Sequence, residues 1–364
     1  MHINSKIKNI IIAALSLIVG GGIIFRDEAA TSGAAEGVRL CANQLIPALF
    51  PFMVICMFIG VSGADELIGR AVEPVAKLLF RLPRRASAAV LLSFIGGYPV
   101  GAHTVGALYK RGELTGHQAN DMLCFCVNAG PAFIVGAVGQ RMLRSTAAGF
   151  ILLAAHLSAS LLIGIAVTRT GHRPRYPADQ QAITNRPCKT DGVPPFTDAL
   201  VKSVSDAAGE MIKICAWVVL FCSLGGIFRS LIHSQTLLAG GHMLLEVTTG
   251  CLYVRDMSLP VMAVVLGFGG LCVHCQIFAA IPFRLSKTRF FISRIIHALL
   301  SGLITFIICR LFPGSVPAFS NAVTPLPAEN PSGFPSSVSL MLMCAVLLIS
   351  ISGKKFKKVD KMHL

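Results

Sequence analysis

Long runs of hydrophobic residues, separated by short polar segments, dominate this chain. A helix of about 20 apolar residues is long enough to cross the hydrocarbon core of a bilayer. Stretches that approach this length are residues 7–25, 45–60, 147–167, 211–228, 290–312 and 338–351. The pattern predicts an all-α polytopic membrane protein with roughly 8–10 membrane segments in a lipid bilayer.

Composition and charge support this class. Of the 364 residues, 54% are hydrophobic and 13% are charged, whereas soluble domains have about 25% charged residues. In a soluble protein the net charge of +15 would suggest a nucleic-acid partner. Here the basic residues lie in short loops and at helix ends, so they indicate membrane orientation. We therefore expect no nucleic-acid partner.

The positions of the basic residues predict which segments face the cytoplasm. The N-terminal segment, the polar stretch 169–202 and the lysine-rich C-terminal tail are expected inside, and the proline-rich stretch 313–337 outside. Residues 1–30 also resemble a signal peptide, with two lysines followed by an apolar run. Because many hydrophobic helices follow, we favour an uncleaved first helix in a multi-pass cell-membrane protein.

Motifs for metal or catalytic chemistry are weak. The 12 cysteines lie mostly in apolar runs, where a free thiol behaves as a small hydrophobic side chain, so we expect no disulfides. The stretches CFC at 124–126 and CVHC at 272–275 lack the second ligand pair of a zinc site. The chain has no P-loop, no HExxH motif and no legible nucleophile–base pair. We therefore expect no enzyme activity, no metal and no cofactor.

A polar, proline-rich segment divides the chain into two hydrophobic halves. The expected organisation is an N-terminal transmembrane helix at 1–37, a first repeat at 38–140, a helix and cytoplasmic linker at 141–197, a second repeat at 198–312, and an outer loop, last helix and basic tail at 313–364.

Landmarks in the two halves share one spacing, which suggests a duplication. The pairs Glu73 and Glu246, Gly96 and Gly269, and His103 and Gln276 are each 173 residues apart. Transporters built from internal repeats bind substrate near the bilayer midplane, between the repeats. The sequence leaves open whether this repeat is inverted or parallel, because segments 67–82 and 235–254 could each cross the bilayer or lie at its surface.

The stretch SFIGGYPVGAHTVGAL, residues 93–108, interrupts an apolar segment. Gly96 and Gly97 permit positive φ, and Pro99 disfavours the helical conformation at Tyr98. Backbone that leaves a helix inside a membrane must line protein or water. A helix that restarts near Gly101 would offer its N–H groups to an anion. The alternative interpretation is a kinked helix with close glycine packing.

A second break is predicted at GFGGLCVHCQ, residues 267–276, around Gly269 and Gly270. His274 and Gln276 lie on this segment, and both are candidates for substrate contact. His103, beyond the first break, could neutralise an acidic substrate when protonated, or it could be a hydrogen-bonded helix residue.

Two further polar groups lie inside apolar stretches, where ionisable and polar residues are functional candidates. Glu246, followed by Thr248 and Gly250, could bind a proton, a cation or a polar substrate. Asn128 could orient a substrate through its amide, or it could cap a helix. Glu73 differs, because Lys77 one turn later offers a structural ion pair.

Six blocks carry a resemblance to a known family. LIPALFPFMV, EPVAKLLFRLP, GGYPVGAHTVGALYKRGELT, CVNAGPAFIVGAVG, LLEVTTG and GFGGLCVHCQ resemble the sporulation integral membrane protein YlbJ family, within the nucleoside-recognition (Gate) domain membrane proteins. The resemblance runs from about residue 38 to residue 312. In the family's pattern, serine stands at the position of Val100 and lysine at that of His103.

The resemblance implies a fold of two Gate-type repeats with re-entrant helical hairpins, related to concentrative nucleoside carriers. Sporulation members of the family are tied to movement of dipicolinate across the membrane around the forespore. Carried over by position, the implied site comprises Gly96, Gly97, Tyr98, Pro99, Gly101 and Asn128 in the first half, and Glu246, Thr248, Gly250, Gly269, Gly270, His274 and Gln276 in the second.

Together, these observations predict a transporter of a small organic anion that works by alternating access around two broken hairpins. Tyr98 would contact an aromatic ring, Asn128 and Thr248 would orient the substrate, and Glu246 or His103 would carry a coupling proton. Two alternatives stay open. One is a nucleoside-type carrier, and the other is a non-transporting membrane scaffold or sensor in spore assembly.

Overall fold

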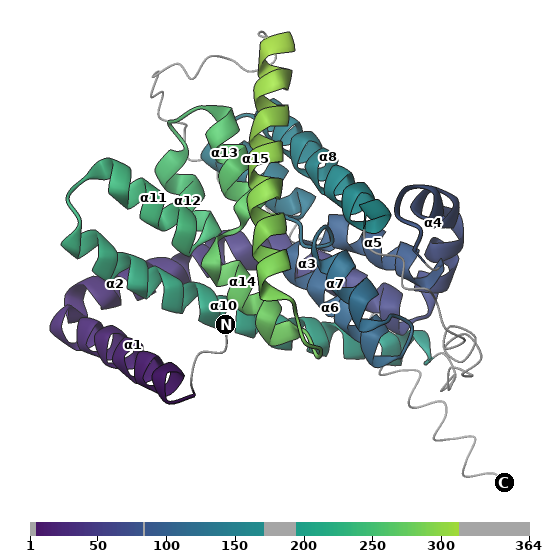
Figure 1. Ribbon diagram of the computed structural model, residues 1–364, viewed down its shortest axis with the longest axis horizontal. Coiled ribbons are helices and arrows are strands. Elements are labelled where there is room, and N and C mark those ends of the chain that lie inside the picture. The colour runs from purple at the N-terminus through teal and green to yellow at the C-terminus, as the bar shows by residue number, and fades with distance from the viewer. Residues whose placement is uncertain (1–4, 83, 171–193, 313–364) are drawn as a thin grey trace, which may run out of the picture. The chain divides into compact units, whose positions relative to one another are not determined.

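The computed structural model describes residues 5–82, 84–170 and 194–312, and every regular element in these ranges is a helix (Figure 1). Five of the helical segments are long and apolar enough to cross a bilayer: Asp27–Val61, Thr146–Thr170, Phe196–Leu231, Leu259–Ala280 and Lys287–Leu311. The prediction of an all-α polytopic membrane protein is confirmed. The predicted segment 338–351, the outer loop 313–337 and the basic tail lie outside the described residues.

The first half begins with a long helical segment that contains α2 (Asp27–Leu40), a π-helical stretch η1 (Cys41–Leu45) and α3 (Ile46–Val61). The helix α1 (Ser5–Phe25) precedes it. The elements that follow are α4 (Ala64–Phe80), α5 (Arg84–Gly96), α6 (Tyr98–Lys110), α7 (Gly116–Leu123), the π-helical η2 (Ala132–Met142) and α8 (Thr146–Thr170).

The second half contains one long helix, two broken helical pairs and a final long helix. The elements are α10 (Phe196–Leu231), α11 (Gln235–Leu245), α12 (Val247–Val254), α13 (Leu259–Phe268), α14 (Gly270–Ala280) and α15 (Lys287–Leu311). Residues 197–202, which the sequence places in the polar loop, belong to α10, because they continue its helical pattern without a break.

The two long segments, Asp27–Val61 and Phe196–Leu231, pack side by side and run antiparallel. Phe58 stacks edge-on against Phe196 at 5.2 Å between ring centroids, and at the other end Arg229 lies 3.6 Å from Glu36. Glycines allow the close approach. A Cβ atom on Gly33 or Gly226 would collide with the backbone of the opposite helix.

We expect Gly226→Ala to lower the free energy of unfolding by about 1–3 kcal/mol, because overpacking forces the two backbones apart. The matched control is Gly209→Ala on the same helix, where nothing lies within 4 Å of the added Cβ. Thermal unfolding of the two purified variants measures the difference. Equal melting temperatures would contradict the described packing.

The halves repeat one order of elements: a long segment, a helical pair, a broken helix and a helix of 25 residues. The counterpart of α5–α6 is α11–α12, and α15 is the counterpart of α8. Since the long segments run in opposite directions, this arrangement is that of an inverted repeat. In this order α8 belongs to the first half, whereas the sequence-based division placed it with the linker.

The spacing of 173 residues does not relate equivalent positions in this arrangement. The offset is 169 between the starts of the long segments and 141 between the starts of α8 and α15. It changes because α4, which carries Glu73, has no counterpart in the second half. Segment 67–82 is therefore the extra helix α4, and segment 235–254 is the pair α11–α12.

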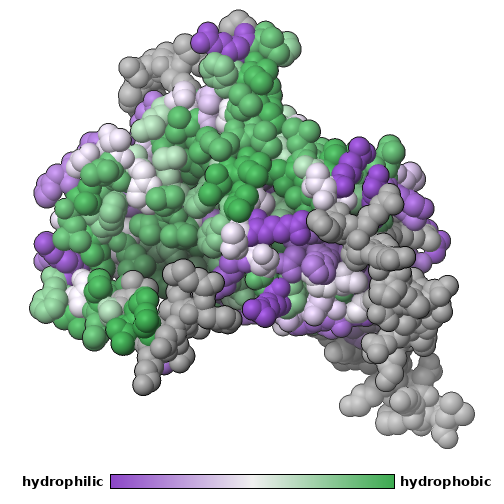
Figure 2. All heavy atoms as spheres, viewed as in Figure 1, coloured by the Kyte–Doolittle hydropathy of each residue, from purple (hydrophilic) through white to green (hydrophobic). Residues whose placement is uncertain are grey.

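Hydrophobic residues cover α15 and the neighbouring α11–α12 on the face shown in Figure 2. Large exposed side chains on α15 include Ile292, Ile295, Leu299 and Leu303. Hydrophilic residues gather where α6 and α7 lie. In a bilayer this apolar surface would contact lipid, so its exposure is expected of a membrane protein.

Candidate functional site

The break at Gly97 turns the chain back on itself. Gly97 has φ of +87°, a conformation that favours glycine, and Pro99 follows in the first turn of α6, where its missing N–H costs nothing. Beyond the turn, α6 packs against α5, and a Cβ at Gly101 would lie 3.0 Å from Ser93 Cβ. Helices α5 and α6 thus form a helical hairpin, here called hairpin 1.

The second hairpin, α11–α12, turns at Glu246 and is called hairpin 2. The rings of His242 and Tyr253, one on each helix, stack at 4.1 Å. The Glu246 carboxylate caps α12 by accepting hydrogen bonds from Thr248 N at 2.9 Å and Thr249 N at 2.7 Å. A carboxylate at this position also complements the positive end of the helix dipole.

The break between α7 and η2, residues 124–130, is held by side chains from three helices. Arg294 of α15 donates to Val127 O at 2.5 Å and to Cys124 O. On α8, Ser160 donates to Phe125 O at 2.6 Å, and His156 Nε2 accepts from Ala129 N. These contacts satisfy buried backbone groups that a broken helix would otherwise leave without partners.

The break between α13 and α14 lies at Gly269 and Gly270, with φ of +83° and +77°. Tyr98 of hairpin 1 donates to Leu266 O at 2.6 Å, and His274 Nε2 is 2.9 Å from Phe268 O. Unlike the two hairpins, α13 and α14 make few contacts with each other and form one interrupted segment. The second hairpin is therefore at Glu246, and the expectation of a hairpin at residues 269–276 is wrong.

Both hairpin tips, both breaks and both long segments meet around one small cavity of about 30 Å³, here called the inner cavity. Its lining includes Gly97, Tyr98, Pro99, Gly130, Glu246, Thr248 and Gln276, with Leu45, Leu49, Ile214 and Val218 from the long segments. Leu45 and Ile214 are 169 residues apart, as are Leu49 and Val218. The cavity therefore lies where equivalent parts of the two halves face each other.

Charge is distributed unevenly around this cavity. Glu246 is 1% exposed and is the one ionisable acid in the lining, which contains no lysine or arginine. An adjoining space of about 220 Å³, here called the outer chamber, shares Pro99, Ile214 and Gln276 with it and is lined by Lys110 and Lys213. The inner cavity is thus closed and polar, and basic groups lie outside it.

The structure brings six of the predicted site residues together at the inner cavity: Gly97, Tyr98, Pro99, Glu246, Thr248 and Gln276. His103 lies in the outer chamber instead. The others support the shape of the site. Gly96, Gly101, Gly250, Gly269 and Gly270 are points of close packing, Asn128 bonds to Phe125 O inside the first break, and His274 bonds to the second.

Sequence reasoning missed the buried group formed by Arg294, His156 and His297. The two histidines are equivalent residues of α8 and α15, their rings lie 4.4 Å apart, and His297 Nε2 is 3.0 Å from His156 O. A serine follows each histidine by four residues, at Ser160 and Ser301. This repeated His-x-x-x-Ser pattern was the available signal.

No group of three or more potential metal ligands occurs in residues 5–82, 84–170 and 194–312. The described site is built from backbone turns, hydroxyls, amides and one carboxylate. Such a set suits recognition of a polar organic molecule rather than permanent binding of a transition metal.

These features define a multi-pass helical membrane protein whose two inverted halves meet at a closed cavity. Residues 42–171 match the family described as Gate, nucleoside recognition. Across 352 residues the chain is 22% identical to the sporulation integral membrane protein YlbJ of Bacillus subtilis (strain 168), which covers 84% of each chain. No solved structure matches significantly. The resemblance expected from the sequence is confirmed.

Proposed function

We propose that this protein is a transporter that moves a small organic anion across the membrane by alternating access. The observation that carries the proposal is the convergence of two hairpin tips, two helix breaks and two antiparallel long segments on one cavity. Repeats, interrupted helices and a polar site between them are typical of secondary transporters. Dipicolinate, which the family resemblance implies, is the first substrate to test.

In the proposed mechanism, each hairpin moves in turn relative to the long segments and opens the cavity to one side. Tyr98 would contact an aromatic ring, and Thr248 and Gln276 would orient polar groups. Glu246 would take up a proton when an anion arrives, because two negative charges in one closed cavity repel each other strongly. The forespore membrane is the proposed location, by similarity to the sporulation protein.

A nucleoside carrier is the second candidate. The match to a family described as nucleoside recognition favours it, as does the inner cavity, which lacks a fixed cation. Uncharged polar groups beside a carboxylate suit the hydroxyls of a ribose as well as they suit a protonated acid.

Uptake by the full chain in proteoliposomes tests the two candidates. We expect labelled dipicolinate to accumulate above protein-free liposomes, and excess unlabelled dicarboxylate to suppress uptake while uridine does not. Suppression by uridine alone would support the nucleoside carrier. Absence of uptake for either compound, by folded protein in both orientations, would overturn the transporter proposal.

A further inference from the structure

The outer chamber is a separate space from the inner cavity and has its own chemistry. It lies between α6, α10 and α14 and is several-fold larger than the inner cavity. Three of its residues, Pro99, Ile214 and Gln276, also line the inner cavity. A molecule held in the outer chamber would therefore be in contact with the tip of hairpin 1.

Basic groups outnumber acidic ones in the outer chamber. Lys110, Lys213 and His103 face it, and Glu210 is the single carboxylate in its lining. Lys213 Nζ lies 2.6 Å from Glu210 Oε1, and His103 Nε2 lies 3.6 Å from the same oxygen. The Glu210 charge is thus shared between two bases, and Lys110 adds positive charge to the chamber.

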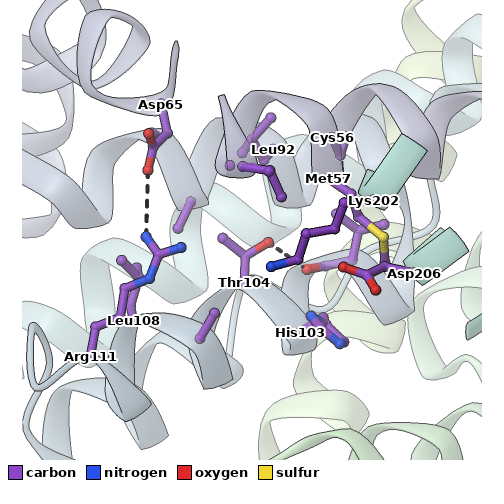
Figure 3. A pocket seen from close by; sticks show the side chains of 16 residues that line it. Cys56, Met57, Asp65, Leu92, His103, Thr104, Leu108, Arg111, Lys202 and Asp206 are labelled. Atoms are coloured by element: carbon purple, nitrogen blue, oxygen red, sulfur yellow. Dashed lines mark hydrogen bonds and ion pairs between the residues drawn. The ribbon is translucent and has the colours of Figure 1, made fainter. Parts of the chain in front are cut away.

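A neighbouring pocket of about 230 Å³ provides a contrast within the same protein (Figure 3). It also contains His103, but there Arg111 and Lys202 are balanced by Asp65 and Asp206. Figure 3 shows the Asp65–Arg111 pair on one side of this pocket, away from Lys202 and Asp206. Excess positive charge is therefore a property of the outer chamber and not of every pocket near His103.

An aromatic wall completes the outer chamber. Trp217, half-buried on α10, lines it one helical turn after Lys213. It is the only tryptophan in the sequence. An indole face beside an ammonium group can stack with a flat ring while the ammonium binds a carboxylate on that ring.

We propose that the outer chamber is a binding site for a small aromatic carboxylate, occupied before the inner cavity opens. The site rests on the proposed transport function and adds a second station to it. An arriving carboxylate binds Lys110 and takes the place of Glu210 at Lys213, so that one ion pair replaces another. A cluster of one charge sign also concentrates anions at the mouth of the cavity.

Fluorescence of the single tryptophan tests this site directly. Purified full-length protein is titrated with phthalate, a flat aromatic dicarboxylate, and with phthalamide, its uncharged analogue. We expect a saturable change in Trp217 emission with phthalate and none with phthalamide. Trp217→Phe serves as the blank.

Lysine variants identify the charges that hold the ligand. Lys213→Met and Lys110→Met are each expected to weaken phthalate binding by about tenfold, the equivalent of about 1.4 kcal/mol. Lys202→Met, in the neighbouring pocket, is the matched control and should bind as the native protein does. Unchanged affinity in both Lys213→Met and Lys110→Met, with melting temperatures also unchanged, would overturn the outer site.

The outer site and the transport function fail in different ways. Phthalate-dependent fluorescence that requires Lys213, with no dipicolinate uptake in proteoliposomes, would leave the binding site standing and overturn transport. Dipicolinate uptake that is indifferent to both lysine substitutions would leave transport standing and overturn the outer site. A fluorescence response to uridine in place of phthalate would also overturn it.

Discussion

Replacing Arg294 with methionine is expected to destabilise the protein more than any other substitution considered above. The guanidinium is 1% exposed and donates to the carbonyl groups of Cys124 and Val127 in the first break. Methionine cannot donate, so each carbonyl would lose its charged partner at a cost of about 1–3 kcal/mol. We therefore expect a large fall in melting temperature or loss of folded protein.

Arg310→Met is the control for this substitution, because it makes the same change on the same helix. Arg310 is exposed, and its guanidinium lies over the Phe306 ring at 5.2 Å, a contact that contributes about 0.5–1 kcal/mol at an exposed site. Arg294→Lys retains a charge and should fall between the two. If Arg294→Met and Arg310→Met melted at the same temperature, the described role of Arg294 would be wrong.

Glu246→Gln is expected to reduce transport by about tenfold or more. The native carboxylate accepts one hydrogen bond on each oxygen at the tip of hairpin 2, whereas glutamine has a single acceptor oxygen. Loss of one charge-assisted bond costs about 1.5–3 kcal/mol, and the variant also loses the proposed proton carrier. Initial uptake rates at several pH values measure both effects.

The control for Glu246→Gln is Glu73→Gln, which removes the other glutamate of the sequence-based pairing. Glu73 lies on α4, the helix without a counterpart in the second half, so transport should keep its rate and pH dependence. Equal losses from the two variants would favour equivalence of the two glutamates and contradict the repeat described above. A Glu246→Gln variant with native uptake and native pH dependence would remove this residue from the mechanism.

The hydrophobic pattern predicted the long helices well, since burial in lipid requires long apolar runs. Residues 211–228 lie inside α10, and the break at Gly97 follows from a glycine pair beside a proline. Hairpin 2 was harder to place. Its tip has neither glycine nor proline, because Glu246 terminates one helix and caps the next with its own side chain.

Contacts between distant helices carried no local signal. Arg294 interacts with backbone carbonyls 167 and 170 residues away, and any sequence offers carbonyls. The repeat was visible only in part, because the extra helix α4 changes the offset between the halves. Convergence of Tyr98, Glu246 and Gln276 on one cavity therefore required the three-dimensional arrangement.

The central claim is that substrate binds between the tips of the two hairpins. Its most direct test is a structure of the full chain in lipid with dipicolinate bound, at a concentration that saturates uptake. The account predicts ligand density between Tyr98, Thr248 and Gln276 in an enlarged inner cavity. Density confined to another surface of a transport-competent protein, with the inner cavity still closed and empty, would contradict it.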